Sequence, residues 1–540
     1  MLAGQPVILL REGTERKSGE DAFRDILRAA HAMADSVRTT LGPRGMDKML
    51  VDSSGDVVIT NDGATIVKQM EVQHPAAKML AEVARAQDLE CGDGTKTSVI
   101  LAGELLHRAE ELLDEHIHPT IIVQGYRMAA ARALEELASI GRPVGRTDTE
   151  TLRAIATTAM MSKGVAAHRD PLAELARRAV DEVIETRGDR LRFDRKHLQM
   201  VRRTGGDVRD SELIEGHLLE QPALHPAMPK VVEPARIALV EGAVEVKKTE
   251  FSAEIRITEA AQLSSFVEEE SRMVQAMVDA VVQSGANVLI VEKGIDDVAA
   301  EHLAKAGVYA VRRAKRSDLD LLSRASGARL VARAQDLGPG DLGSAGRVEE
   351  RKIGEDRVTL VTRCPHARSV TLLLRGGTEH VVEEVERSMV DAVSVIGLAL
   401  EDGRVVTGAG AAAVELAARL RDYALGIGGR EQMAVEAFAS ALEVIPLTLA
   451  ENAGMDRIDA LIELRRRHKA GEVDVGVDVL RSRVGPMGAV ALEPIRVGRQ
   501  AIEGATETAT MLLRIDDVIA AKRTGGAGRG GGPPTGGLEE

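Results

Sequence analysis

The sequence predicts a multidomain protein of mixed α+β and α/β architecture, in which a small α/β unit is nested inside a mostly helical chain. The chain has 540 residues, which at roughly 100–200 residues per domain corresponds to three or four domains. Helical periodicity dominates the first 145 residues and returns in the last third of the chain. Between these parts, short apolar strands alternate with helices, a pattern typical of βαβ units around a parallel sheet.

Composition limits the possible functions. Hydrophobic residues make up 44% and charged residues 29%, which is ordinary for a soluble globular protein. The net charge of −14 and the absence of Trp argue against a nucleic-acid binder. The longest uncharged run, Ala280 to Val291, is too short to span a membrane. Two cysteines cannot build a disulfide framework. We therefore predict a cytoplasmic protein that binds neither nucleic acid nor a membrane.

The first part of the chain shows repeated helical patterns, broken by an extended stretch after the first helix. In the segment Thr97–Leu113, for example, apolar residues recur at helical spacing. The Gly- and Pro-containing segment 141–145 ends this part and is the first predicted domain boundary. The expected elements are a helix over Ala22–Thr40, extended chain over Lys48–Thr60, and helices over Pro75–Leu89, Thr97–Leu113 and Pro119–Ile140.

The remainder divides into a mixed part, an α/β part and a second helical part. Residues 146–214 predict helices followed by a strand pair around Arg190–Thr204. After Thr371–Leu374 we expect helix to Ala521, and the Gly- and Pro-rich segment 524–540 predicts a disordered tail. In the α/β part, we expect strands at Asn287–Val291, Val308–Val311 and Ala328–Val331, and helices at Ile295–Ala306 and Asp318–Ala325.

The segment Gly92-Asp93-Gly94-Thr95-Lys96-Thr97-Ser98 is the strongest chemical signal. Two glycines allow the backbone to approach a ligand closely, and the segment opens a helix whose free amides favour a phosphate. Asp93 is placed where a Mg²⁺ ion that bridges phosphate oxygens would need an oxygen ligand. The spacing differs from that of a Walker A loop. From these residues alone, an ordinary helix N-cap remains the alternative.

Other motifs are weaker when taken one at a time. The loops around Asp62, Pro43 and Gly408-Ala409-Gly410 suit a nucleotide, but they equally suit a turn or a helix end. The histidines show no H-E-x-x-H spacing, and no G-x-S-x-G motif supports a serine hydrolase. Cys91 beside the phosphate-loop candidate is best interpreted as a small apolar residue.

Taken together, long segments resemble the group II chaperonins, the thermosome and its eukaryotic cytosolic relatives. They include TTLGPRGMDKMLVD from Thr39, GDVVITNDGATIVKQM from Gly55, GDGTKTS from Gly92, ANVLIVEKGIDD from Ala286 and LLRGGTEHVVEEVERSMVDA from Leu373. Further matching segments extend the resemblance over nearly the whole chain, from residue 5 to residue 522.

The resemblance implies an ATPase that folds proteins inside a double ring. Non-native client proteins would be enclosed under a built-in lid, and the ring would be a homo-oligomer or a hetero-oligomer with paralogues. Strand-like edges at Pro6–Leu10 and Met46–Val51 would pair between neighbouring subunits. The implied domains are equatorial (1–145 and 403–523), intermediate (146–214 and 369–402) and apical (215–368), with a protrusion over about 245–275 of the apical part that forms the lid.

The resemblance also implies an ATP site with Mg²⁺. Asp62 and Asp391 would flank the γ-phosphate and orient the attacking water, and Lys163 would sense that phosphate. Asp93 would bind the Mg²⁺ ion. The implied nucleotide contacts are Leu41, Gly42 and Pro43 in a first loop, Gly92, Asp93, Gly94, Thr95, Thr97 and Ser98 in the phosphate loop, and Gly408, Gly410 and Glu493 near the nucleoside.

Several positions depart from the family pattern, which leaves an alternative open: a divergent subunit that hydrolyses ATP weakly and acts as a holdase or as a structural partner of a paralogue. A small-molecule kinase is disfavoured because no Walker A or kinase lysine motif is present. Leu319, Leu321 and Leu322 are candidate client contacts, with helix packing as the other reading. The departures are Cys91, Lys96, Ala409, Ala413 and Gly498-Arg499.

Overall fold

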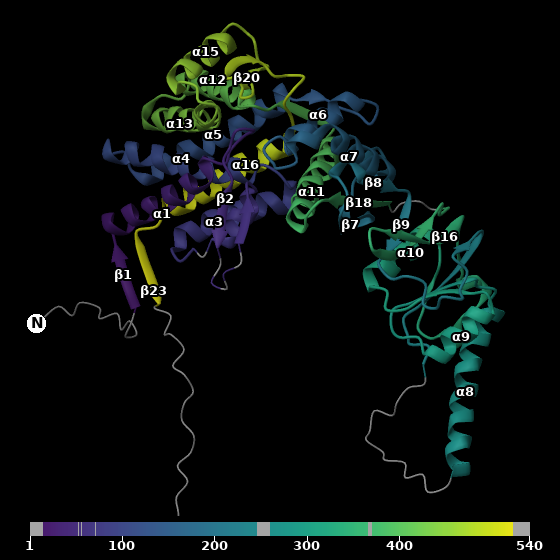
Figure 1. Ribbon diagram of the computed structural model, residues 1–540. Helices are drawn as coiled ribbons and strands as arrows, with labels where there is room; N and C mark the ends of the chain where they lie inside the picture. Colours follow the sequence, from purple (N-terminus) through teal and green to yellow (C-terminus); the bar gives the residue numbers. More distant parts are fainter. Residues whose placement is uncertain are drawn as a thin grey trace, which may run out of the picture.

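A computed structural model describes residues 14–51, 53, 55, 57–70, 72–245, 260–365 and 370–521. These residues form an elongated, bent molecule of three blocks (Figure 1). The predicted tail, the edge strand at 6–10 and the part of the predicted protrusion over 246–259 lie outside the described residues.

The largest block is helical and contains both the first and the last helices of the chain. Leu105, Phe438 and Ala505 come from distant parts of the sequence and are all fully buried in its core. Its helices are α1 (Glu20–Arg38), α2 (Gly63–Gln69), α3 (Pro75–Cys91), α4 (Thr95–Asp114), α5 (Pro119–Ile140), α12 (Ala411–Leu425), α13 (Gly429–Leu442), α14 (Val444–Asn452), α15 (Arg457–Lys469) and α16 (Ile495–Leu512).

Short strands surround this helical core. The expectation of continuous helix up to Ala521 is wrong, because several strands of three to five residues separate the helices there. β1 (Thr14–Ser18) pairs antiparallel with β23 (Asp517–Ala521), so these segments lie side by side (Figure 1). The other strands are the hairpin β2 (Lys48–Val51) and β3 (Val57–Thr60), the pair β20 (Val475–Asp478) and β21 (Arg483–Pro486), and the sheet of β4 (Arg142–Pro143), β19 (Arg404–Thr407) and β22 (Leu492–Pro494).

The middle block packs three helices against a small sheet. The strand pair predicted around Arg190–Thr204 is wrong in its pairing, because the two strands there have different partners. Local periodicity finds strands, but it does not identify a partner about 170 residues away in the sequence. The helices are α6 (Thr149–Met160), α7 (Arg169–Val183) and α11 (Glu379–Asp402); β7 (Leu198–Thr204) pairs in parallel with β18 (Val370–Gly376), which also pairs with β8 (Glu212–Ile214), and β5 (Glu185–Arg187) pairs with β6 (Arg190–Arg192).

The third block has the predicted parallel sheet. Its parallel strands are β13 (Tyr309–Val311), β12 (Val288–Val291), β11 (Ala235–Val240) and β14 (Leu330–Val331), with β15 (Gly343–Ala345) antiparallel to β11. A second, antiparallel sheet consists of β10 (Val231–Val232), β16 (Arg347–Ile353), β17 (Asp356–Thr362) and β9 (Gly216–Leu219). The helices are α8 (Ala260–Gln283), α9 (Asp297–Lys305) and α10 (Arg316–Ser326), with short 3₁₀ helices at Ala334–Asp336 and Pro339–Asp341. In the middle block, further 3₁₀ helices cover Ala166–His168, Arg195–His197 and Val208–Asp210.

Two helices of this block, α10 and α8, bear on the expected client contacts and on the predicted protrusion. Leu319 and Leu322 of α10 are completely buried against the sheet, so helix packing explains them and they are not client contacts. The second half of α8 packs onto the block through Val274, Val278 and Val281. Residues 268–273 are exposed, and α8 extends away from the block (Figure 1).

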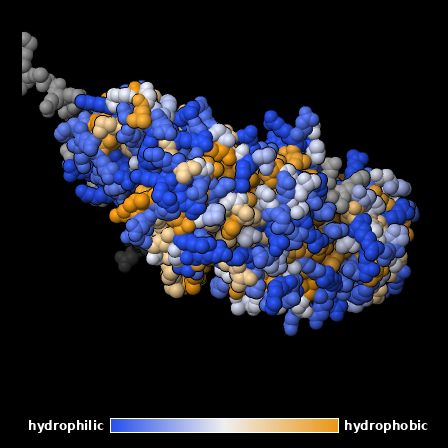
Figure 2. Space-filling model, turned by 90° about the horizontal axis from the view of Figure 1, so that it is seen from above, coloured by the Kyte–Doolittle hydropathy of each residue, from blue (hydrophilic) through white to orange (hydrophobic). Residues whose placement is uncertain are grey.

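One apolar segment, Gly429–Asn452, has the length and hydropathy of a membrane span. It comprises α13 and α14, and 67% of its apolar window is buried inside the protein. Such burial is typical of the core helix of a globular domain. The face shown in Figure 2 is mostly hydrophilic, with hydrophobic residues in scattered groups.

Candidate active site

The predicted phosphate loop connects α3 to α4. Gly92 and Gly94 have φ values of 70° and 82°, a left-handed conformation that suits glycine. A Cβ atom at Gly92 would lie 2.8 Å from Cβ of Ser394, and one at Gly94 would lie 2.7 Å from Cγ1 of Val497. Both the backbone conformation and the lack of space therefore require glycine.

The loop leaves the start of α4 open to a ligand. The N–H of Ser98 donates to the carbonyl of Gly94 at 3.0 Å, and this closes the first turn of the helix. The amides of residues 95–97 precede that bond and point out of the helix end, where the helix dipole also favours an anion. The Ser98 hydroxyl is buried and donates to the carbonyl of Thr95 at 2.8 Å, so it closes the turn rather than facing the cavity.

Asp93 is fixed at the centre of the loop. Its Oδ1 accepts a hydrogen bond from the Gly94 amide at 2.6 Å, and Nε2 of Gln87 donates to its carbonyl at 2.9 Å. Burial raises the pKa of the Asp93 carboxyl, while the charge of Lys163 opposes this increase. A cation beside this carboxylate would offset the unfavourable burial of its charge.

Lys163 and Asp391 form a buried ion pair. Asp391 lies on α11, whose Val385 and Met389 are fully buried, and Lys163 follows α6. Burial alone would lower the pKa of Lys163, but the carboxylates of Asp391 and Asp62 outweigh it, so this pKa lies above its ordinary value. Burial raises the pKa of Asp391, and Lys163 opposes that increase. Asp391 is therefore not a solvated helix acid.

Asp62 caps the start of α2. Its Oδ2 accepts hydrogen bonds from the Thr65 amide at 2.8 Å and the Thr65 hydroxyl at 2.7 Å. Burial acts to raise the pKa of Asp62, but the charge of Lys163 and the bonds from Thr65 bring it below its ordinary value. Asp62 is therefore held in its ionised form.

Lys96 belongs to the same cluster, although the sequence alone does not show whether its side chain lies beside the phosphate loop or in solvent. Its Nζ donates to the carbonyls of Thr40 at 3.0 Å and Asn61 at 3.2 Å, and to Oδ1 of Asn61 at 2.6 Å. Burial lowers the pKa of Lys96 to about 8, and the charge of Lys163 adds to this. Gly63 is the sequence feature that is related to this contact, because a Cβ at that position would lie 2.6 Å from Cγ of Lys96.

The phosphate loop opens into a cavity with an apolar wall. Glu493 lines this cavity, and burial raises its pKa to about 7, with a further contribution from the charge of Asp93. A Cβ at Gly408 would lie 2.5 Å from Oε1 of Glu493, so glycine gives that carboxyl its space. No sequence motif indicated the other lining residues, which include Thr158, Ile445, Leu449, Val477, Val479 and Met487.

The departures at the second glycine loop are accommodated. Ala409 has a φ of 54°, an unusual value for a residue with a side chain. Its carbonyl accepts a hydrogen bond from the Val477 amide at 3.0 Å, which fixes the loop against β20. Ala409, Gly410 and Gly498 line the cavity, whereas Arg499 is exposed.

The predicted residues do not all line one cavity. Leu41, Gly42, Pro43, Asp93, Gly94, Thr95, Thr97, Gly410 and Glu493 line the cavity described above. Asp62 and Asp391 line an adjacent cavity together with Asp88, an acid that the sequence did not single out. Burial raises the pKa of Asp88, and the charge of Asp62 adds to this. Four predicted residues are not among the lining residues of either cavity but contact residues beside them. Gly92 lies against Ser394 and Gly408 against Glu493, Ser98 bonds the Thr95 carbonyl, and Lys163 pairs with Asp391.

Comparison with known proteins identifies the family. The model of the TCP-1/cpn60 chaperonin family matches residues 33–523. The chain is 53% identical to thermosome subunit beta of Archaeoglobus fulgidus over 98% of both chains, and 52% identical to thermosome subunit alpha of the same organism over 96% of both. A solved open-state monomer of a group II chaperonin from Methanococcoides burtonii matches 78% of this chain and all of its own, with a TM-score of 0.61 and 41% identity.

The chain therefore belongs to the TCP-1/cpn60 chaperonin family, and the predicted family and fold class are confirmed. Within that family it is a group II chaperonin subunit of the thermosome type. It is an ATPase that couples hydrolysis to protein folding inside a double ring with a built-in lid.

Proposed function

We propose that Asp62, Asp93, Lys96, Lys163 and Asp391 form the hydrolytic centre of this chaperonin. The observation that carries the proposal is their convergence near the start of α4, where Asp62, Asp93 and Asp391 all act on the pKa values of Lys96 and Lys163. Lys96 and Lys163 balance part of the acidic charge from two different blocks of the molecule. Phosphoryl transfer to water needs such positioned charge more than it needs a covalent nucleophile.

Each side chain has a role that fits its surroundings. Asp391 and Asp62 face a common cavity and are placed to orient and deprotonate the attacking water. The raised pKa of Asp391 makes its carboxylate a better base than an exposed one. Lys163 is protonated and would exchange its contact with Asp391 for the γ-phosphate.

The phosphate loop and the apolar cavity fit a nucleotide with Mg²⁺. Three helix-end amides meet the phosphates, the glycines allow close approach, and the apolar wall around Val477 suits a base. Asp93 provides the carboxylate oxygen that Mg²⁺ prefers. A Mg²⁺ ion at this position would neutralise developing charge on the phosphates.

We further propose that the three blocks are the equatorial, intermediate and apical domains with the boundaries given above. The separate hydrophobic cores of the blocks support this division. Similarity to both an alpha and a beta thermosome subunit of one organism supports a ring shared with a paralogue. Non-native proteins in the cytoplasm are the proposed clients.

Substitution of Asp391 tests the catalytic assignment. Alanine would leave the buried Lys163 without its partner, so Asp391→Asn is the better variant because it keeps the shape and a hydrogen-bond acceptor. We expect Asp391→Asn to assemble and bind ATP but to hydrolyse it roughly 10²–10⁴-fold more slowly. Asp93→Ala should instead weaken nucleotide binding itself. Steady-state phosphate release and equilibrium ATP binding measure the two effects.

A matched control is Glu383→Gln, which changes an acid on the same helix that pairs with Arg202 away from the cluster. This variant should retain normal turnover. Near-normal hydrolysis by Asp391→Asn would contradict the assignment and move the catalytic role to Asp62.

A further inference from the structure

Helices α1 and α4 pack against each other at close range. A Cβ at Gly103 of α4 would lie 2.4 Å from Cβ of Ala34 on α1, so the helices touch through small residues there. His31 lies three residues before Ala34, and His107 lies four residues after Gly103. One turn away from the crossing, the antiparallel helices therefore bring the two histidines together.

The two histidines meet a carboxylate at this point. The rings of His31 and His107 stack edge to face, with their centroids 5.2 Å apart. Glu110 lies one turn beyond His107 on the same face of α4. One potential ligand atom from each of His31, His107 and Glu110 lies within 4.8 Å of the other two. The distances between ligands around a bound metal are shorter, but small side-chain rotations can close this gap.

One imidazole nitrogen in this group makes no hydrogen bond to the part of the chain that the structure describes. Nε2 of His31 is buried and has no hydrogen-bond partner among the residues that the structure describes. Buried polar atoms in native proteins almost always have a partner, so an unpaired one calls for a missing ligand. A metal ion is the kind of partner that this nitrogen lacks, because a histidine nitrogen binds a metal ion through its lone pair.

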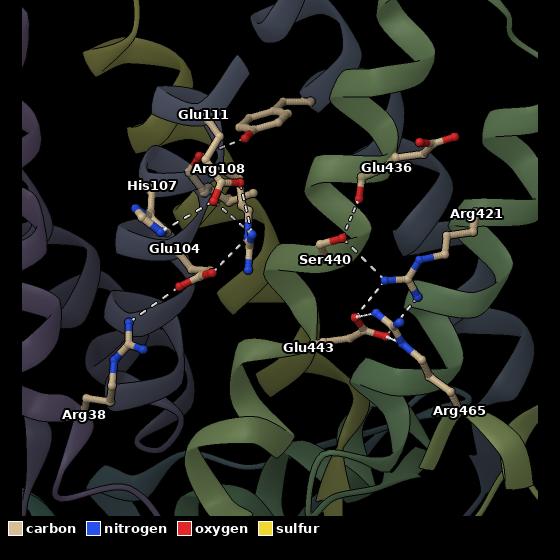
Figure 3. Close-up of polar contacts among 12 residues, drawn as sticks. Arg38, Glu104, His107, Arg108, Glu111, Arg421, Glu436, Ser440, Glu443 and Arg465 are labelled. Atoms are coloured by element: carbon tan, nitrogen blue, oxygen red, sulfur yellow. Dashed lines mark hydrogen bonds and ion pairs between the residues drawn. The ribbon is translucent and has the colours of Figure 1, made fainter. Parts of the chain in front are cut away.

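The surroundings favour a positive charge. Asp35, Glu104 and Glu110 all act on His31 as negative charges. Figure 3 shows Glu104 directed toward Arg38 of α1, and His107 beside Glu111. Glu111 lies 3.8 Å from Nε2 of His107 but already accepts hydrogen bonds from Arg108, so it is a neighbour of the group rather than one of its members.

We propose that His31, His107 and Glu110 form a binding site for a divalent transition metal, Zn²⁺, and that the bound ion links α1 to α4. Two imidazoles and one carboxylate are a donor set that suits Zn²⁺, whereas Mg²⁺ and Ca²⁺ prefer oxygen ligands alone. Because His107 and Glu110 are reachable from solvent, the ion can enter and water can complete its coordination. The site is separate from the ATP site, which lies at the opposite end of α4.

Metal binding to the untagged full-length chain tests this site. Equilibrium dialysis against Zn²⁺ without nucleotide, read by elemental analysis, should find one tightly bound ion per chain. Co²⁺ should give the visible absorption of a site with nitrogen ligands. His107→Gln and Glu110→Gln should each weaken Zn²⁺ binding at least tenfold. Zn²⁺ should also raise the thermal unfolding midpoint of the unmodified chain, but not that of His107→Gln.

Two controls separate this site from other metal binding. His118→Gln changes an exposed histidine that caps α5 and should leave Zn²⁺ binding unchanged. Asp93→Ala should also leave it unchanged, because the ATP site is not involved. His107 is exposed, so its substitution should preserve the fold, as far-UV circular dichroism can verify. Equal Zn²⁺ affinity in the unmodified chain and His107→Gln, or loss of binding in Asp93→Ala, would overturn the proposal.

Discussion

At the scale of single residues, Lys96 gives the proposed ATP site a property that the loop sequence alone does not predict. Its ammonium joins the loop after α1 to the loop before α2, through the carbonyls of Thr40 and Asn61. The same ammonium faces the acids of the cluster. Lys96 therefore both positions two loops and adds a positive charge beside the phosphate loop.

This charge predicts a pH dependence of nucleotide binding. Because the pKa of Lys96 is lowered to about 8, its charge is present at pH 7 and is lost as the pH rises through 8. The affinity of the unmodified protein for ATP should fall by about tenfold between pH 7 and pH 9, because the attraction of one nearby positive charge for the phosphates is lost. Lys96→Gln should bind ATP more weakly at pH 7 and should lack this decrease.

Lys78→Gln is the control, because Lys78 is an exposed lysine on α3. The pKa of Glu493 lies at about 7, so it also titrates in this range, but it does so in all three proteins. The difference between the unmodified protein and Lys96→Gln therefore isolates Lys96. Identical pH profiles for these two proteins would show that the charge of Lys96 does not reach the nucleotide.

Local sequence patterns indicate the loop residues of the proposed site better than they indicate the partners of those residues. Asp93, Gly92 and Gly94 follow from local chemistry, because a loop that opens a helix needs glycine and an acid in fixed order. The pairing of Lys163 with Asp391 joins residues 228 positions apart, and no local pattern indicates it. Thr158 of α6 and Val477 of β20 line the cavity only because elements that are distant in the sequence meet there.

At the scale of elements, the carboxylate of Glu443 holds three helices together. It lies at the start of α14 with 2% of its side chain exposed. Arg421 of α12 and Arg465 of α15 both donate to it, with distances of 2.8 Å from Nη1 of Arg421 and 2.8 Å from Nε of Arg465 (Figure 3). This arrangement fixes the orientation of α12, α14 and α15 relative to one another.

Removal of this charge should destabilise the helical block. Breaking a buried ion pair costs roughly 3–5 kcal/mol, and we expect the lower end for Glu443→Gln because both arginines keep contact with water. Burial acts to raise the pKa of Glu443, but the arginines outweigh it and bring the pKa below its ordinary value. The stabilisation is therefore present above the ordinary pKa and is lost as the pH falls through the lowered one.

The melting temperature of Glu443→Gln should be several degrees below that of the unmodified protein at pH 7, and the difference should shrink in acid. Glu463→Gln is the control, since Glu463 pairs with Arg466 on the surface of α15. An equal decrease in both variants would show that the buried position has no special weight. Limited proteolysis within α12–α15 would place the effect in this block.

Helices could be predicted from the sequence more completely than strands. The helix over Pro119–Ile140 was predicted with its observed bounds, because Pro and the apolar period both mark it. Short strands such as β19 and β22 carry too few residues to show a period, and their pairing depends on parts of the chain that are far apart.

At the scale of the whole molecule, the hairpin β2–β3 is an exposed apolar surface. Met49 and Ile59 are 66% and 57% exposed on the hairpin, although both are large and apolar. A two-stranded hairpin is marginally stable by itself, and its open edges can accept another strand. We expect a strand of a neighbouring subunit to cover this surface in the ring.

Charged substitutions on the hairpin should therefore prevent assembly. Met49→Lys combined with Ile59→Lys should abolish ring formation, as judged by size exclusion and electron microscopy, while the helical signal in circular dichroism stays unchanged. Val298→Lys, on the α/β block, is the control because Val298 is similarly exposed but lies on α9. Intact rings from the double variant would exclude the hairpin from the subunit contact.

The helical block joins segments that are far apart in the sequence, and this has a consequence for how the chain is synthesised. Helices α3, α4 and α5 emerge from the ribosome early, but they pack against α12, α13 and α16. Translation must pass through residues 141–403 before those partners exist. The α/β block is nearly continuous in sequence and can fold in the meantime. For most of translation, the apolar faces of the first helices therefore have no partners to cover them. A subunit that protects other proteins is thus itself prone to aggregation while it is being synthesised.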